Sequence, residues 1–155
     1  MSTDPHETPV TSIDESAPVI ARHEIEINAP LDRVWGLHVN VAAWPTWNPD
    51  ITVATLEQPF APGASFLWHT AGLSIESTIY SVTERSRTLW GGRVSGITGI
   101  HEWTFDETAD GVRVRTNESW SGAPVEANLA MAQAGLDQSL VSWLNHMKTA
   151  AEARA

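Results

Sequence analysis

The sequence contains no cysteine among its 155 residues, which excludes disulfides, thiolate metal ligands and a cysteine nucleophile. No window approaches the roughly 18 consecutive apolar residues that a membrane-spanning helix needs. Positive charge is also scarce, because nine Lys and Arg stand against nineteen Asp and Glu and give a formal net charge of −10. Such a chain repels phosphate backbones and anionic lipid headgroups, so we expect neither nucleic acid nor membranes as partners.

The first twenty residues differ in composition from the rest of the chain. They are polar, acidic and rich in Pro, Ser and Thr, and they lack the basic region followed by an apolar stretch that marks a signal peptide. We therefore expect a disordered acidic tail over residues 1–19, one domain over residues 20–153 and a cytoplasmic protein.

The spacing of apolar residues divides this domain into short elements. His23, Ile25 and Ile27 alternate with charged residues, which predicts a half-buried strand over residues 22–28. Pro30 suits the start of a short helix over 31–38, and Asn40 suits the cap of a second over 41–47. Six further strands are predicted over residues 51–57, 65–70, 73–82, 88–93, 97–105 and 112–120. The turn sequences between strands are Ala61-Pro62-Gly63, Ala71-Gly72, Gly91-Gly92 and Asp110-Gly111.

A long helix is predicted from Pro124 onward. Over about 30 residues, one stripe of the helix is apolar, with Leu129, Leu136, Leu140, Trp143, Leu144 and Met147. This stripe must pack against a large apolar surface. Together the elements indicate an α+β fold, in which a curved seven-strand antiparallel sheet wraps around the long helix. Because the helix covers only part of the concave face, a cavity is expected beside it.

Alternation along the strands indicates which side chains face this cavity. Phe66, Trp68 and Ser77 share the inward face of their hairpin. In the last hairpin, the alternation leaves His101 and Glu118 as the polar residues inside, directly opposite each other or diagonally adjacent. Such a pair is a candidate general acid/base couple. The alternative is a structural contact in which the two side chains satisfy each other's hydrogen bonds.

Tryptophan dominates the aromatic residues, with eight Trp against three Phe and one Tyr. Large flat side chains of this kind either fill a core or line a pocket. The sequence has no His, Asp and Glu trio at metal-ligand spacing and no Gly-rich loop between a strand and a helix. We therefore expect neither a metal nor a cofactor.

Several segments occur in an order that resembles one known family. They are EIEINAPLDRVWGLHVNVAAWPTWNPDI (residues 24–51), residues 63–68, HEWTF (101–105), NESWSG (117–122) and DQSLVSWLNHMKTAAE (137–152). In this respect the chain resembles the START-like helix-grip superfamily, in particular its polyketide cyclase/dehydrase (SRPBCC) branch. The resemblance spans about residues 20–153.

The resemblance implies a deep pocket between the sheet and the terminal helix, entered near the two short helices and the hairpin tips. It makes all the tryptophans candidates for ligand binding, beside Phe66 and Ser77: Trp35, Trp44, Trp47, Trp68, Trp90, Trp103, Trp120 and Trp143. The expected ligand is a small hydrophobic molecule that is polyketide-like, aromatic or a lipid.

Three functions fit this expectation. The first is an enzyme in which His101 and Glu118 move protons during the cyclisation or dehydration of a polyketide-like intermediate. The second is a carrier or sensor that binds an apolar ligand without changing it. The third is an interaction scaffold with a vestigial pocket, and in each case we expect a monomer or a homodimer.

Overall fold

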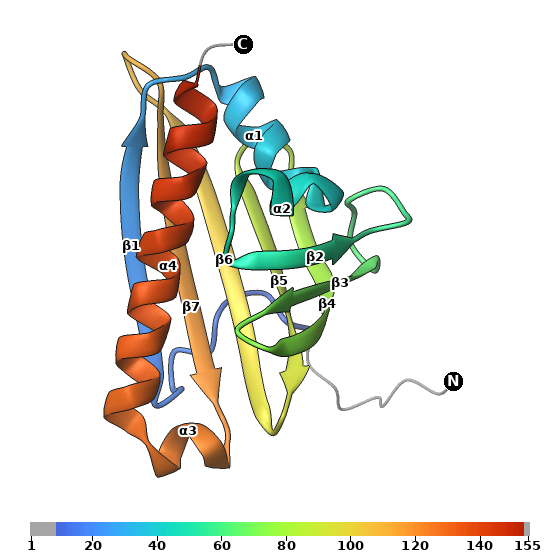
Figure 1. Ribbon diagram of the computed structural model, residues 1–155, viewed down its shortest axis with the longest axis vertical. Helices are drawn as coiled ribbons and strands as arrows, with labels where there is room; N and C mark the ends of the chain where they lie inside the picture. The colour runs from blue at the N-terminus through green and yellow to red at the C-terminus, as the bar shows by residue number, and fades with distance from the viewer. Residues whose placement is uncertain (1–8, 154–155) are drawn as a thin grey trace.

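Seven strands form one antiparallel sheet in the computed structural model, which describes residues 9–153 (Figure 1). They are β1 (Val19–Ile27), β2 (Ile51–Thr55), β3 (Ser65–Thr70), β4 (Leu73–Thr83), β5 (Arg87–Val94), β6 (Ile97–Glu107) and β7 (Val112–Ser121). Their order is β1-β7-β6-β5-β4-β3-β2, so the first strand pairs with the last and all other neighbours are consecutive in sequence. In Figure 1, β2 and β3 run across the direction of β1, β7 and β6, which shows how strongly the sheet curls. The predicted α+β architecture is confirmed.

The helices lie on the concave side of this sheet. They are α1 (Leu31–Val39), the 3-10 turn η1 (Val41–Ala43), α2 (Trp44–Trp47), α3 (Ala123–Ala127) and α4 (Leu129–Glu152). The long helix predicted from Pro124 is divided, because Asn128 leaves the helical conformation with φ of −146°. Within the described part of the chain, no helix is long and apolar enough to cross a membrane.

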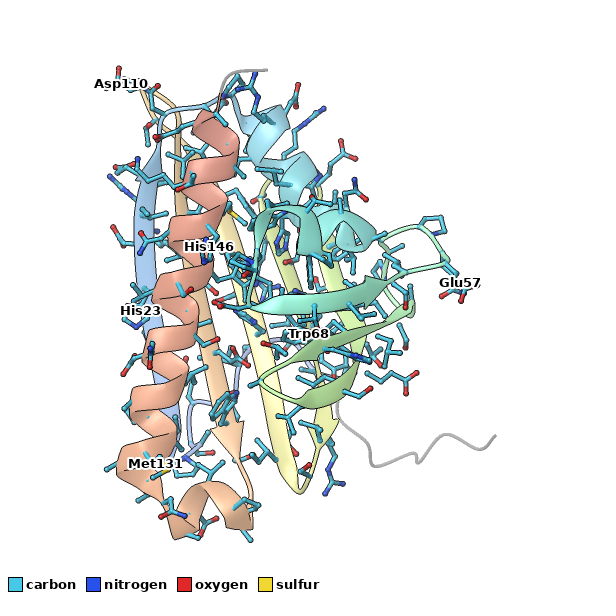
Figure 2. The ribbon with its side chains drawn as sticks, viewed as in Figure 1. His23, Glu57, Trp68, Asp110, Met131 and His146 are labelled. Carbon is cyan, nitrogen blue, oxygen red and sulfur yellow. The ribbon has the colours of Figure 1, made fainter. Side chains whose placement is uncertain are left out.

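Helix α4 runs along β1 and β7 (Figure 1). The face of α4 that packs on the sheet carries the buried residues Leu136, Leu140 and Leu144, as the predicted stripe requires. Leu129, in the first turn of the helix, is 48% exposed. A hydrogen bond of 2.7 Å between His23 Nε2 on β1 and Asp137 Oδ1 ties the helix to the sheet edge (Figure 2).

The Gly91-Gly92 pair is not a turn, which corrects the sequence prediction. Both residues lie inside β5, and the hairpin to β6 turns at Ser95 (φ 52°) and Gly96 (φ 82°). Two consecutive left-handed residues suit a tight hairpin turn. Gly91 and Gly92 are required for another reason: a Cβ on Gly91 would collide with the backbone of β6, and one on Gly92 with the backbone of β4.

The segment before β1 also differs from the prediction. Residues 1–8 of the expected tail lie outside the described residues, but the part that follows packs on the outer face of the sheet. Ile13 is only 4% exposed, and the backbone N–H of Asp14 donates to Ser119 Oγ over 2.9 Å. Arg87 donates a further hydrogen bond to the carbonyl oxygen of Thr11. The buried side chain of Ile13 and these two hydrogen bonds hold this stretch on the sheet.

We predict that Gly91→Ala destabilises the fold by about 1–3 kcal/mol, because the new methyl group must displace the backbone of β6. Chemical denaturation followed by circular dichroism would measure the change. Gly36→Ala is the matched control, since a Cβ there meets no heavy atom within 4 Å and the substitution favours the helix. Equal stabilities of the two variants would contradict this account of β5.

Candidate functional site

A cavity of about 290 Å³ lies between α4 and the concave face of the sheet. Its walls come from β3 to β7 and from one side of α4. The exposed lining residues mark its mouth: Ala71 and Leu73 at the tip of the β3–β4 hairpin, and Gly135 and Ser139 on α4. The lining residues are Trp68, Thr70, Ala71, Leu73, Ile75, Ser77, Trp90, Gly91, Gly92, Val94, Ile97, Gly99, His101, Glu118, Trp120, Gly135, Leu136, Ser139 and Trp143. The surface is therefore largely apolar.

Seven of the predicted site residues meet in this cavity. Four indole rings are spread over different elements, since Trp68 comes from β3, Trp90 from β5, Trp120 from β7 and Trp143 from α4; the other three residues are Ser77, His101 and Glu118. Residues at the tips of the β3–β4 and β5–β6 hairpins line the cavity, whereas no residue of α1, η1 or α2 does. The expected entrance at the short helices is therefore wrong.

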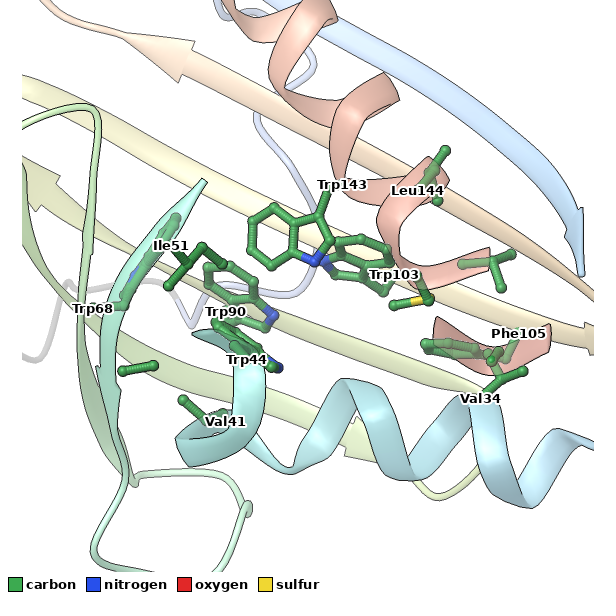
Figure 3. Close-up of a cluster of buried hydrophobic side chains, with 14 of the residues drawn as sticks. Val34, Val41, Trp44, Ile51, Trp68, Trp90, Trp103, Phe105, Trp143 and Leu144 are labelled. Carbon is green, nitrogen blue, oxygen red and sulfur yellow. The ribbon is translucent and has the colours of Figure 1, made fainter. Parts of the chain in front are cut away.

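The other five predicted ligand-binding residues do not line the cavity: Trp35, Trp44, Trp47, Phe66 and Trp103. They fill the opposite half of the concave face, under α1 and α2, where they belong to one packed apolar cluster (Figure 3). The ring centroids of Trp44 lie 5.4 Å from Phe66 and 5.3 Å from Trp143. Trp35 packs edge-on against Phe105 at 5.3 Å.

His101 and Glu118 face each other directly across β6 and β7, as the alternation predicted. His101 Nδ1 lies 3.3 Å from Glu118 Oε1, and the two side chains are 2% and 16% exposed. The second oxygen, Oε2, accepts a hydrogen bond of 2.9 Å from Trp120 Nε1. His101 Nε2 is hydrogen-bonded to Thr116 Oγ1 at 2.6 Å. Each carboxylate oxygen of Glu118 thus contacts another side chain, and the carboxyl group lies at the wall of the cavity.

Burial shifts the ionisation of both groups. Removal from water raises the pKa of Glu118 to about 7, although the hydrogen bond from Trp120 acts in the opposite direction. Burial, and to a smaller extent the nearby His38, lowers the pKa of His101 well below its usual value of 6.5. Near neutral pH, the site therefore holds a neutral imidazole and a carboxyl group poised to gain or lose a proton. This is the condition that general acid/base chemistry requires.

A second buried polar pair escaped sequence reasoning. His38 of α1 is fully buried, and its Nε2 lies 2.8 Å from Thr88 Oγ1. Burial lowers the pKa of His38 to about 3, so this imidazole is also neutral. Trp103 stands between the two histidines, with ring centroids 4.9 Å from His38 and 5.0 Å from His101. Thr88 and Trp90 are two residues apart on β5, so their side chains point to the same face of the sheet. This alternation could have identified Thr88 as an inward-facing residue.

Among residues 9–153, no group of three or more His, Asp or Glu side chains is arranged to hold a metal ion. The chemistry that this cavity can perform with its own residues is proton transfer at Glu118. The neighbouring indole rings can also hold a flat or flexible apolar molecule and exclude water from it.

Comparison with known proteins places this fold in a defined group. Residues 18–152 match the family model described as polyketide cyclase/dehydrase and lipid transport. No curated protein matches the sequence significantly.

Solved structures share the fold at low sequence identity. A hypothetical protein from Helicobacter pylori is 16% identical, with a TM-score of 0.79 over 94% of this chain and 99% of its own. A START superfamily protein from Mycobacterium smegmatis is 11% identical, with a TM-score of 0.71 over 86% of this chain and 97% of its own. The di-domain ARO/CYC BexL from the BE-7585A biosynthetic pathway is 18% identical, with a TM-score of 0.72 over 88% of this chain and 50% of BexL.

We predict that Glu118→Gln becomes more stable relative to the wild type as the pH rises from about 4.5 to about 7. In this range the unfolded wild-type chain releases the Glu118 proton while the folded protein retains it, so the wild type loses stability. The difference should reach up to about 3 kcal/mol. Denaturant unfolding of both proteins across this pH range would measure it.

Glu102→Gln is the matched control on the outer face of the sheet. Partial burial acts to raise the pKa of Glu102, but hydrogen bonds from Asn117 and Arg87 outweigh it and lower the pKa. The wild type should therefore gain stability over Glu102→Gln as the pH rises toward about 4.5, and the difference should stay constant from there to about pH 7. A difference between Glu118→Gln and the wild type that stays constant with pH would show that the carboxyl group of Glu118 titrates normally.

Proposed function

The chain belongs to the polyketide cyclase/dehydrase and lipid transport family, and we propose that it binds a small hydrophobic molecule in the cavity between α4 and the sheet. The single observation that carries this proposal is the composition of that cavity. Four indole rings and several aliphatic side chains surround one carboxyl group at the wall. Apolar walls with a few placed polar groups are the usual features of a small-molecule site.

We further propose that Glu118 transfers protons to and from a polyketide-like or aromatic ligand. In an aldol ring closure, its carboxylate would accept a proton from the carbon beside a keto group. The resulting acid would then donate a proton to the new alkoxide or, during dehydration, to the departing hydroxyl group, which leaves as water. His101 would position Glu118 through the 3.3 Å contact, because its other nitrogen is engaged by Thr116.

A non-catalytic carrier or sensor is the second candidate function, and one observation favours it. Both oxygens of Glu118 and both ring nitrogens of His101 already have partners within the protein. A polar pair with a purely structural role would make the same contacts. In a carrier, the same carboxyl group would recognise one polar group of the ligand without reacting.

We predict that aromatic or aliphatic ligands quench the intrinsic tryptophan fluorescence in a saturable way, since indole rings line the cavity. Ser139→Phe should weaken this binding at least tenfold, because residue 139 of α4 lines the cavity and the larger side chain would occupy it. Gln138→Phe is the control on the same helix, at an exposed position outside the lining. Absence of quenching by polyketide mimics, fatty acids and sterols alike would favour the vestigial-pocket scaffold.

The enzyme and the carrier are separated by Glu118→Gln. If Glu118 is the acid/base group, the substitution should lower turnover of a bound polyketide mimic about 10²–10⁴-fold and leave its Kd within about threefold. Turnover followed by mass spectrometry, with Kd from calorimetry on the same samples, would measure both. Unchanged turnover in Glu118→Gln, together with weakened binding in Trp143→Phe, would remove the enzyme hypothesis in this form.

A further inference from the structure

The size of the cavity limits what can occupy it. An apolar cavity of about 150 Å³ in another protein holds one benzene molecule. By proportion, about 290 Å³ accommodates about a dozen non-hydrogen atoms, which is one ring with substituents or two fused rings. A ligand of three or more fused rings, or a long acyl chain, would have to remain partly outside the mouth.

The charges around the cavity limit its occupant further. None of the described residues that line it is Lys or Arg, and Glu118 supplies its one carboxyl group. His101 adds no positive charge, because burial keeps its imidazole neutral. An anionic ligand would therefore leave water, meet no cation and approach a carboxylate, and each of these steps opposes binding.

Gly99 leaves a small space open beside the carboxyl group. A Cβ on Gly99 would lie 3.4 Å from Glu118 Oε2 and 3.5 Å from the indole ring of Trp120, and it would point into the cavity. The Trp120 N–H occupies one lone pair of Oε2, so the other can meet a ligand group above Gly99. A hydroxyl group suits this place, because it can donate to a carboxylate or accept from a carboxylic acid.

We propose that the ligand is a neutral aromatic molecule of one or two rings, whose hydroxyl group lies in the space above Gly99 and hydrogen-bonds to Glu118. This inference rests on the proposed function and names its substrate class. The rings lie among the indoles of Trp68, Trp90 and Trp143, which line the cavity.

The test uses four probes of known structure, measured by calorimetry on the full chain. We expect 2-naphthol to bind saturably. We expect 2-naphthoate, which has the same rings with an anionic group, and 2-hydroxyanthracene, which has one more ring, to bind at least tenfold more weakly. Decanoate serves as the fatty-acid probe and should also bind at least tenfold more weakly than 2-naphthol.

Two variants connect the preference to the named residues. Glu118→Gln removes the negative charge, so the preference for 2-naphthol over 2-naphthoate should fall at least tenfold. Gly99→Ala should weaken 2-naphthol binding about tenfold, because its methyl group fills the space beside Oε2. Gly36→Ala is the control, at a position of α1 outside the cavity lining where a Cβ meets no heavy atom within 4 Å. Each variant is first shown to have the wild-type circular dichroism spectrum, and the Glu118 test stands if Gly99→Ala does not fold.

The outcomes distinguish this inference from the proposed function. Binding of decanoate, 2-naphthoate or 2-hydroxyanthracene as tight as that of 2-naphthol would overturn the inference and leave the proposed function intact. An unchanged preference in Glu118→Gln would overturn the role of the carboxyl group. No binding by any of the four probes, nor by larger polyketide mimics and sterols, would overturn both.

Discussion

The side chain of Trp143 packs α4 into the aromatic cluster on the concave face of the sheet. Its ring centroid lies 5.3 Å from those of Trp44 and Trp103 and 5.6 Å from that of Trp68, so it contacts aromatic rings of three different elements. Aromatic side chains bury large areas, and edge-on pairs add further attraction. On one side of Trp143 the concave face is filled, and on the other it is open. Trp143 therefore belongs both to the packed core and to the wall of the cavity.

The interior also buries two histidines and a glutamate, which is costly unless they are neutral or paired. Thr88 and Thr116 each provide a hydroxyl group to one imidazole, and Trp120 provides an N–H group to Glu118. Each of these three side chains thus has a hydrogen-bond partner, on another element for the two histidines and on the same strand for Glu118, although Nδ1 of His38 has none among the described residues. The hydrogen bond from Trp120 keeps the carboxyl group of Glu118 at the cavity wall, which His101 also lines, while His38 stays within the packed side. The carboxyl group thus lies where the packing of the concave face ends.

The sequence predicts the architecture well because each strand alternates and each inward residue has a periodic signal. The pairing of His101 with Glu118 follows from the register of one hairpin. Periodicity cannot separate rings that fill a core from rings that line a cavity, so Trp103 and Trp90 looked alike. Periodicity also cannot reveal that the backbones of β6 and β4 lie against Gly91 and Gly92. This is why the pair was interpreted as a turn. The burial of Ile13 depends on a distant surface that local composition does not describe.

The crowding of indoles has an optical consequence. The ring centroids of Trp44, Trp68, Trp90, Trp103 and Trp143 form pairs at 5.3 to 6.2 Å. Chromophores this close can transfer excitation energy to one another before they emit, so the five rings do not act as isolated emitters. Excitation energy absorbed by a ring in the packed half can therefore be transferred to a ring on the cavity side and quenched there. The ultraviolet emission of these five rings therefore responds to a change at any one of them, beside the separate emission of Trp35, Trp47 and Trp120.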